Sequence, residues 1–238
     1  MKDLAVIVPV YNEEGAIEKV IDKWTQELDK YGIDYNICAY NDGSKDNTAQ
    51  ILENLSEKFP GLKFVNKQNS GHGSTILQGY RENCKEYEWI FQIDSDDEMG
   101  PEGFNSLWSQ KDNYDFLVGI RDHRIQSLPR KIISMVSRLT IKIFYGLNGP
   151  YDVNSPYRLM RSEKFVNLFE KIPAQTFAPN VIISGFVANK KLRFYQTPVE
   201  CKLRQTGEVS IQKLKLLKAA AKSFMQTLAF ASKLKGIK

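Results

Sequence analysis

The sequence is short of the residues from which disulfide scaffolds, zinc sites and membrane spans are built. Its three cysteines, Cys38, Cys84 and Cys201, are scattered without paired spacing, which argues against both a disulfide framework and a zinc site. No run approaches the roughly 20 uninterrupted apolar residues of a spanning helix. Met1-Lys2-Asp3 leads into a strand-like run rather than a signal peptide. We therefore expect a protein of a reducing compartment that has no membrane span of its own.

Acidic residues are nearly missing from the C-terminal part of the chain. From Cys201 onward there are nine Lys or Arg and one acid, although the whole chain has a net charge of only +5. The basic character is therefore local. Such a tail suggests nucleic acid as one partner, but aromatic side chains that would stack on bases are not interleaved with these lysines. We expect no nucleic-acid partner.

The first half of the sequence alternates short β-branched runs with longer amphipathic ones, which is typical of a parallel sheet with helical crossovers. The predicted strands cover residues 4–10, 35–40, 62–66, 88–94, 115–119 and 192–199. The predicted helices cover residues 13–30, 46–59, 74–85, 101–110, 128–145, 177–190 and 210–234, and the segment 151–176 is expected to be hairpin-like or irregular. The sequence predicts an α/β fold with a mostly parallel sheet flanked by helices, one domain over residues 1–238, and a C-terminal basic amphipathic helix.

A cluster of acids follows the fourth predicted strand. Its members are Asp94, Asp96, Asp97 and Glu98, directly after the apolar run Trp89-Ile90-Phe91. The carboxyl ends of parallel strands face the ligand crevice of an open sheet, and a hard divalent cation relieves the repulsion among carboxylates packed this closely. Mg²⁺ or Mn²⁺ held there would stabilise charge on a leaving diphosphate. The alternative is a solvated acidic turn before the helix that begins at residue 101.

Polar residues also follow the first three predicted strands. Tyr11, after the first, could stack on a planar base, and Asp42, after the second, could accept hydrogen bonds from a base or a ribose. The glycine-rich loop 69–73, after the third, could bring backbone N–H groups close to a phosphate or a sugar. Each feature also has a purely structural interpretation, because such residues begin helices and form turns. Their occurrence together at one sheet edge favours a ligand site.

These segments resemble, in order and in strand context, inverting glycosyltransferases of the nucleotide-diphospho-sugar fold, called GT-A. They are Val8-Pro9-Val10-Tyr11-Asn12-Glu13, Asn41-Asp42-Gly43-Ser44, Asn69-Ser70-Gly71-His72-Gly73 and Asp94-Ser95-Asp96. The resemblance implies that residues 1–120 are the nucleotide-sugar-binding half, with the sugar nucleotide contacted by Pro9, Tyr11, Glu13, Asp42, Asn69, Gly71, Gly73 and Asp94. It implies that Asp94 and Asp96 act in catalysis by holding the metal and the diphosphate. Glu98 falls where the branch described next usually has glutamine as a further metal ligand.

Residues 121–238 resemble the dolichol- or polyprenyl-phosphate branch of that family and are the expected acceptor-binding half. The resemblance is carried by Val118-Gly119-Ile120-Arg121, Arg130-x-x-x-Ser134, Asp152 with Tyr157-Arg158-Leu159, and Pro198-Val199 followed by Arg204-x-x-Gly207. It implies that the acceptor phosphate is bound by Arg121, Arg130, Ser134 and Arg204. Guanidinium groups suit phosphate oxygens. Asn180 and Cys201 depart from the branch, in which many members have glutamate and histidine.

The scarcity of histidine bears on the acceptor. A sugar hydroxyl loses a proton as it attacks, so an enzyme that uses one needs a general base, and neither His72 nor His123 lies in an obvious base context. A lipid phosphate is already ionised near neutral pH. We therefore expect a metal-dependent inverting transfer from a UDP- or GDP-linked sugar to polyprenyl phosphate, with Asp152 as a base or positioning group. The alternatives are a transferase of the same fold that acts on a glycan hydroxyl, and a non-catalytic nucleotide- or membrane-binding module.

Two basic, apolar helices are expected to contact a membrane. In residues 128–145 and 210–234, apolar side chains at helical spacing are accompanied by Lys and Arg, as in an interfacial helix. Anionic headgroups attract each nearby cation by about 1 kcal/mol. Both stripes could instead pack on the sheet. The expectation is a peripheral protein at the cytoplasmic, inner face of the membrane, brought there by these helices or by a membrane partner protein.

Overall fold

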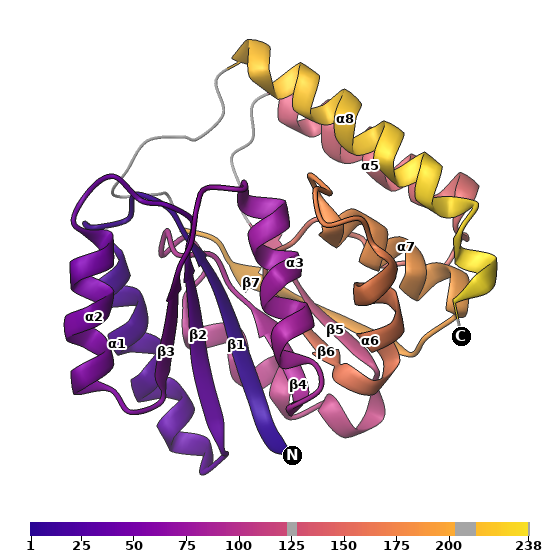
Figure 1. Ribbon diagram of the computed structural model, residues 1–238. Helices are drawn as coiled ribbons and strands as arrows, with labels where there is room; N and C mark the ends of the chain where they lie inside the picture. Colours follow the sequence, from indigo (N-terminus) through magenta and orange to yellow (C-terminus); the bar gives the residue numbers. More distant parts are fainter. Residues whose placement is uncertain (123–127, 203–212, 238) are drawn as a thin grey trace.

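A computed structural model describes residues 1–122, 128–202 and 213–237 and places them around one seven-stranded sheet (Figure 1). The strand order is β3-β2-β1-β4-β6-β5-β7. The strands are β1 (Lys2–Val10), β2 (Tyr35–Asn41), β3 (Leu62–Asn66), β4 (Tyr87–Gln92), β5 (Phe116–Asp122), β6 (Arg158–Arg161) and β7 (Phe194–Glu200). Neighbouring strands are parallel except at β6, which is antiparallel to both β4 and β5.

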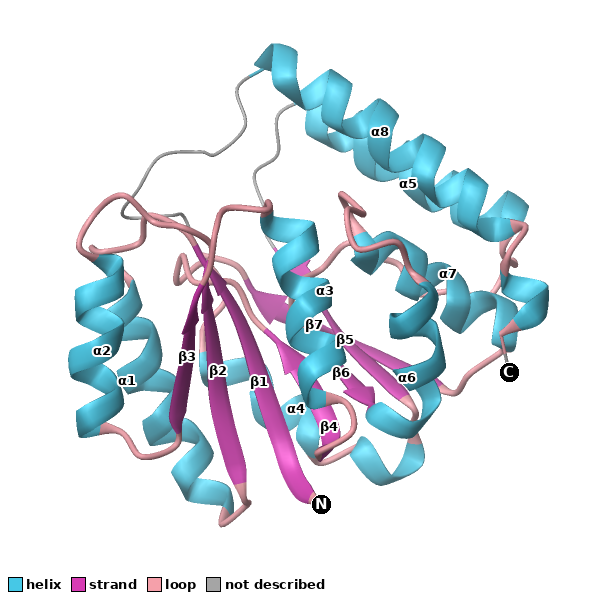
Figure 2. Ribbon diagram, viewed as in Figure 1, coloured by secondary structure: helices cyan, strands magenta, loops and turns pink. Residues whose placement is uncertain are grey.

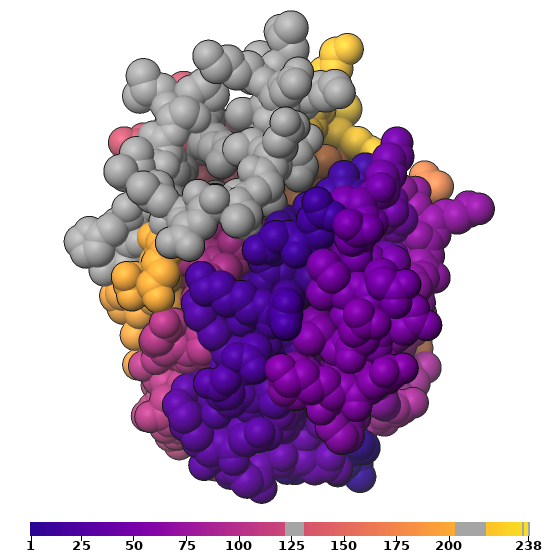
Figure 3. Space-filling model, turned by 90° about the vertical axis from the view of Figure 1, so that its left-hand side faces the viewer, coloured from indigo at the N-terminus to yellow at the C-terminus, as the bar shows by residue number. Residues whose placement is uncertain are grey.

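Helices cover both faces of the sheet (Figure 2). They are α1 (Ile17–Leu28), α2 (Thr48–Lys58), α3 (His72–Asn83), α4 (Phe104–Trp108), α5 (Leu128–Phe144), α6 (Ser162–Lys171), α7 (Pro179–Lys190) and α8 (Lys213–Ala231). One core contains α1, α2 and α4, and the other contains α3, α6 and α7. The helices α5 and α8 lie side by side on the outer side of α7 (Figure 1). Viewed from the side of α1 and α2, the surface is formed chiefly by the N-terminal half of the chain (Figure 3).

The central strand β1 is apolar from Leu4 to Val10 because this part is buried on both faces. Leu4, Val6 and Val8 belong to the core that contains α1, and Ala5 and Ile7 belong to the core that contains α3. Successive side chains of a strand point to opposite faces of the sheet. A continuous apolar run is therefore what a parallel strand covered by helices on both sides requires.

The sequence-based expectation for the segment that follows Pro150 is wrong. The segment 151–176, expected to be hairpin-like or irregular, contains β6 and α6. β6 has only four residues and begins with Arg158, so it lacks an apolar run long enough to indicate a strand. In α6 a helical stripe was present in the sequence, because Phe165, Leu168 and Phe169 are all fully buried on one side.

The C-terminal helix α8 packs on the protein and also exposes apolar side chains. Phe230 is 2% exposed, whereas Phe224 and Met225 are 39% and 62% exposed. The hydroxyl of Tyr145, at the end of α5, donates a hydrogen bond to the carbonyl of Thr227 in α8. Within the described ranges, no helix is long and apolar enough to cross a membrane.

Candidate active site

The carboxyl ends of β1, β2 and β4 meet at one edge of the sheet, and the loops that follow them are tied together. Val10 pairs with Asn41 of β2, and Ile7 pairs with Gln92 of β4. The backbone N–H of Asn12, whose φ is +54°, donates to Ser44 Oγ at 2.9 Å, and its Oδ1 accepts from the N–H of Lys45 at 2.8 Å. The sequence predicted this convergence from the parallel strand order.

Tyr11, the predicted base-stacking residue, lies at this edge and is more exposed than its neighbours Pro9 and Glu13. Tyr11 is 38% exposed, so its ring is open to a planar partner. Pro9 is buried at the end of β1. Glu13 is buried, and its backbone N–H donates to Thr48 Oγ1 at 2.9 Å. Tyr11 is thus the accessible member of this group.

Asp42 organises the glycine-rich loop. It is buried, and it accepts hydrogen bonds from the backbone N–H groups of Ser70 and Gly71, both at 2.8 Å, and from the ammonium of Lys67. Burial acts to raise the pKa of Asp42, but the hydrogen bonds and the charge of Lys67 outweigh it and hold the pKa below its usual value. The sequence missed Lys67 because nothing in its spacing distinguishes it from a solvent-exposed lysine.

The glycines of loop 69–73 serve local geometry. Gly71 has a φ of +89°, which favours glycine, and its N–H is taken by Asp42. A Cβ on Gly73 would lie 2.1 Å from the carbonyl oxygen of Phe177, so this glycine lets the start of α3 pack directly on the 176–177 backbone. Asn69 is exposed, and its amide donates to the carbonyl of Asp42 at 2.8 Å. Contact between this loop and a sugar nucleotide stays a prediction.

Asp94 lies two residues beyond the end of β4 and is held by a buried network that the sequence did not reveal. Its Oδ1 accepts a 3.4 Å hydrogen bond from the side-chain amide of Gln92. Gln92 Oε1 accepts in turn from the Tyr80 hydroxyl at 2.5 Å and from the Asn180 amide at 2.8 Å. Because both donors converge on one oxygen, the amide NH₂ of Gln92 is directed toward Asp94. The same oxygen of Asp94 lies 3.6 Å from Nε2 of the exposed His72.

The remaining acids of the cluster are separated by their contacts. Asp97, with a φ of +55°, is paired with Lys19 at 2.8 Å and Lys23 at 2.9 Å. Burial acts to raise the pKa of Asp97, but these lysines hold the pKa below its usual value. The carboxylate of Asp96 accepts the N–H of Glu98 at 3.2 Å. Asp97 is therefore a structural acid held by two lysines.

The donor set suits a cation that binds few protein ligands. Among the described residues, no three His, Cys, Asp or Glu side chains are placed to hold one ion, so Asp94, Asp96 and Glu98 do not form a ready-made cage. Asp94 is 32% exposed on its side chain. Mg²⁺ is usually bound by one or two carboxylates together with phosphates and water, and oxygen donors also suit Mn²⁺. Asp94 and Asp96 fit that pattern, and Glu98 as a further ligand stays a prediction.

Arg121 and Asp152 form a bidentate ion pair beside the acid cluster. Arg121 Nε and Nη2 each lie 2.7 Å from an oxygen of Asp152, and the two side chains are 12% and 16% exposed. Burial acts to raise the pKa of Asp152, but Arg121 holds it below the usual value. Burial also acts to lower the pKa of Arg121, which Asp152 and Asp94 nevertheless raise. Asp152 is therefore ionised and a weak base, which favours a positioning role.

A buried arginine supports both sides of the site. Arg158 is fully buried, and its partners among the described residues are backbone carbonyls, at 2.6 Å for Ser155, 3.1 Å for Asn180 and 3.4 Å for Val153. Burial lowers its pKa to about 10, so it remains a cation at neutral pH. Its bonds tie the segment that carries Asp152 to the first turn of α7. The sequence signal for this buried arginine was its position between Tyr157 and Leu159, because a charged side chain among apolar neighbours needs partners when it is buried.

The other predicted acceptor residues lie partly outside the described part. Ser134 is exposed on α5. Arg130 belongs to the first turn of α5, but its side chain is outside the described residues, as is the whole of Arg204. The convergence of these residues on Arg121 stays a prediction.

This α/β protein has a candidate ligand site at one edge of its sheet. The ends of the strands there carry carboxylates, an exposed tyrosine and an arginine–aspartate pair. The family model described as Glycosyl transferase family 2 matches residues 5–169. The chain belongs to that family and is a glycosyltransferase.

Solved structures with little sequence identity share the fold. Glucosyl-3-phosphoglycerate synthase of Mycobacterium tuberculosis, crystallised with Mn²⁺, UDP-glucose and phosphoglyceric acid, is 15% identical, with a TM-score of 0.69 over 100% of this chain and 81% of that chain. Mannosyl-3-phosphoglycerate synthase of Rubrobacter xylanophilus is 13% identical, with a TM-score of 0.69 over 99% and 75%. S. aureus TarS 1-349, crystallised with UDP-GlcNAc, is 17% identical, with a TM-score of 0.59 over 97% and 74%. The predicted GT-A fold class is confirmed.

Proposed function

We propose that this glycosyltransferase moves a sugar from a nucleoside diphosphate donor to a polyprenyl phosphate at a membrane surface. The observation that carries the proposal is that Asp94 and the Arg121–Asp152 pair lie at the same edge of the sheet. Gln92 near the end of β4 and Val118 of β5 both pair with Arg158 of β6, so Asp94 and Arg121 follow neighbouring positions of this register. A donor diphosphate next to Asp94 and an anionic acceptor next to Arg121 would lie beside each other, as transfer between them requires. Two solved structures of the same fold contain UDP-glucose and UDP-GlcNAc, which supports a nucleoside diphosphate donor here.

On the donor side, Tyr11 would stack on the base while Asp94 and Asp96 hold Mg²⁺ or Mn²⁺. Tyr11 is open at the edge, and the two acids offer the oxygen ligands that these ions prefer. A bound ion neutralises charge on a leaving diphosphate. The glucosyl-3-phosphoglycerate synthase structure contains Mn²⁺ with UDP, which supports a divalent ion here. Glu98 is the proposed further ligand.

The Gln92 amide gives a test of the donor side. Gln92→Glu keeps the oxygen that Tyr80 and Asn180 bind but replaces the NH₂ facing Asp94 with an oxygen. We expect Mn²⁺-dependent binding of the donor, measured by calorimetry, to weaken roughly 10- to 100-fold, as is usual when partners of metal ligands are changed. Tyr80→Phe removes one donor to Gln92 and leaves its amide facing Asp94, so its effect should be several-fold smaller. Wild-type affinity in Gln92→Glu would show that the network does not position Asp94.

On the acceptor side, an ionised phosphate needs no general base. Asp152 has a lowered pKa and both of its oxygens are engaged by Arg121, so it is poorly suited to take a proton from a hydroxyl. A phosphate approaching Arg121 would compete with Asp152 for the guanidinium fork. Arg130, Ser134 and Arg204 are the proposed further phosphate ligands.

Membrane contact is proposed for the outer face of α5 and α8. Large apolar side chains that are more than half exposed on this layer are Ile132, Met135, Leu139, Ile143, Phe144 and Met225. Lys131 and Lys142 of α5 and Lys222 of α8 are exposed among them. An apolar stripe bordered by lysines suits the interface of an anionic bilayer. We place the enzyme at the cytoplasmic face as a peripheral protein, with a membrane partner protein as a further means of recruitment.

Transfer to a lipid can be measured directly. The enzyme is supplied with radiolabelled UDP- and GDP-sugars, Mn²⁺ and a short polyprenyl phosphate, and the label is partitioned into organic solvent. We expect organic-phase label that requires both the acceptor and Mn²⁺ and that Asp96→Ala abolishes. Label that stays in water but is transferred to an added glycan would identify a hydroxyl acceptor instead. Absence of metal-dependent donor binding would favour the non-catalytic module.

A further inference from the structure

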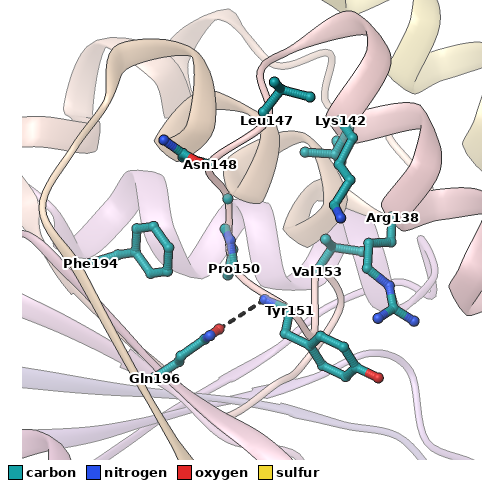
Figure 4. A pocket seen from close by; sticks show the side chains of 11 residues that line it. Arg138, Lys142, Leu147, Asn148, Pro150, Tyr151, Val153, Phe194 and Gln196 are labelled. Atoms are coloured by element: carbon teal, nitrogen blue, oxygen red, sulfur yellow. Dashed lines mark hydrogen bonds between the residues drawn. The ribbon is translucent and has the colours of Figure 1, made fainter.

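A cavity of about 530 Å³ lies between the C-terminal half of α5, the segment 147–153 and β7 (Figure 4). Part of its wall is apolar, with Leu147, Pro150 and Val153 from the segment and Phe194 from the sheet, and the amides of Asn148 and Gln196 also line it. None of its lining residues belongs to the donor or acceptor site described above. The volume is within the range of cavities that take small ligands.

The cavity is positively charged. Arg138 and Lys142, one turn apart on α5, line it, and no acidic residue does. Among the described residues neither cation has a carboxylate within ion-pair distance. Both side chains extend from α5 toward the segment that carries Tyr151 (Figure 4). Two cations in an apolar surround favour an anionic ligand.

The cationic wall is held in place before any ligand arrives. The Arg138 guanidinium lies 4.0 Å from the centre of the Tyr151 ring, which is a cation–π contact. The backbone N–H of Tyr151 donates to Gln196 Oε1 at 2.9 Å, which anchors the segment to β7. A side chain already oriented by such contacts loses less conformational entropy when it binds an anion.

The surroundings of the cavity indicate an amphiphile. Leu147, at its rim, is 79% exposed, and Ile143 and Phe144 at the end of α5 are 63% and 52% exposed. A free inorganic anion would gain nothing from these apolar groups, whereas acyl chains would cover them. We propose that this cavity binds the phosphate headgroup of an anionic phospholipid while its acyl chains cover the end of α5. The inference deepens the membrane contact in the proposed function and rests on it.

The test uses dihexanoyl phosphatidylglycerol below its micellar concentration, titrated calorimetrically into the enzyme of residues 1–238. We expect saturable binding that weakens roughly 30-fold in Arg138→Gln/Lys142→Gln, since each cation near an anionic headgroup is worth about a factor of five. Lys58→Gln/Lys164→Gln removes the same charge from exposed sites on α2 and α6 and should bind as wild type. Thermal unfolding of each variant checks that the fold is retained.

Further measurements distinguish a lipid headgroup from free inorganic phosphate as the ligand of the cavity. They also test the cavity separately from the proposed polyprenyl phosphate acceptor. Vesicles with phosphatidylglycerol should bind the enzyme more tightly than pure phosphatidylcholine vesicles, and the difference should shrink in the double variant. Equal binding by the double variant, or inorganic phosphate binding as tightly as the lipid, overturns the inference. Sugar transfer to a short acceptor in detergent is measured alongside. If the double variant loses headgroup binding but still transfers sugar, the result supports the cavity as the lipid site. If the wild-type enzyme binds the headgroup but does not transfer sugar to the polyprenyl phosphate, the result contradicts only the proposed acceptor.

Discussion

Asp94→Asn is expected to reduce sugar transfer about a thousandfold while the protein stays folded. The substitution keeps the size of the side chain and an oxygen that the Gln92 amide can bind, but it removes the negative charge that would hold a divalent ion at the leaving diphosphate. Losing one preorganised electrostatic contact to a transition state costs about a hundredfold to a thousandfold. The measurement is the initial rate of nucleoside diphosphate release with saturating donor and Mn²⁺.

Asp97→Asn is the matched control, because it removes an acid three residues away in the same loop. Asp97 is paired with Lys19 and Lys23, and asparagine tolerates its positive φ. We expect its transfer rate to stay within a few-fold of wild type and its stability to fall by about 1 kcal/mol. If Asp97→Asn were as inactive as Asp94→Asn, the cluster would act through its total charge. Wild-type activity in Asp94→Asn would remove Asp94 from the mechanism.

The first half of the fold was predictable because its elements carry strong periodic signals. The run 4–10 is apolar throughout, so it predicted a strand, and the structure confirms β1 at Lys2–Val10. The predicted helix at 101–110 is instead a 3-10 turn at Pro101–Gly103 followed by the five-residue α4. Glycine and the tight packing of Phe104 against Trp24 and Phe91 interrupt the periodic pattern there. Short elements are decided by such tertiary contacts, which a linear sequence does not display.

The residues that hold Asp94 in place could not be predicted from the sequence for a related reason. Tyr80 and Asn180 lie on two different helices, and nothing in the spacing of these residues or of Gln92 in β4 indicates that the three side chains meet. Their meeting depends on α3 and α7 packing on the same face of β4, which motif order does not specify. Gln92 alone gave a signal, as an amide in an otherwise apolar strand end. Ligand-facing residues can be predicted because ligands bind at the carboxyl ends of parallel strands. The residues that support them depend on how the helices of this particular protein pack on the sheet.

Asp152→Asn is expected to destabilise the protein by about 3 kcal/mol at pH 7, because it leaves the Arg121 guanidinium, 12% exposed, without its carboxylate. Glu88→Gln is the matched control: it breaks the Glu88–Arg161 pair, in which Glu88 is 49% exposed, and should cost less than 1 kcal/mol. Both values come from urea unfolding with the midpoint and slope fitted separately.

The pH dependence of that loss identifies its cause. The pKa of Asp152 is lower in the folded state than its usual 3.8, so its ion pair stabilises the protein fully above the unfolded-state pKa. That contribution disappears as the pH falls through the folded-state pKa, because protonation then removes the charge in wild type as the substitution does in the variant. The difference in unfolding free energy between wild type and Asp152→Asn should therefore be constant from pH 8 to about pH 5 and shrink below about pH 4. A difference that stayed constant to pH 3 would assign the loss to packing or hydrogen bonding instead of charge.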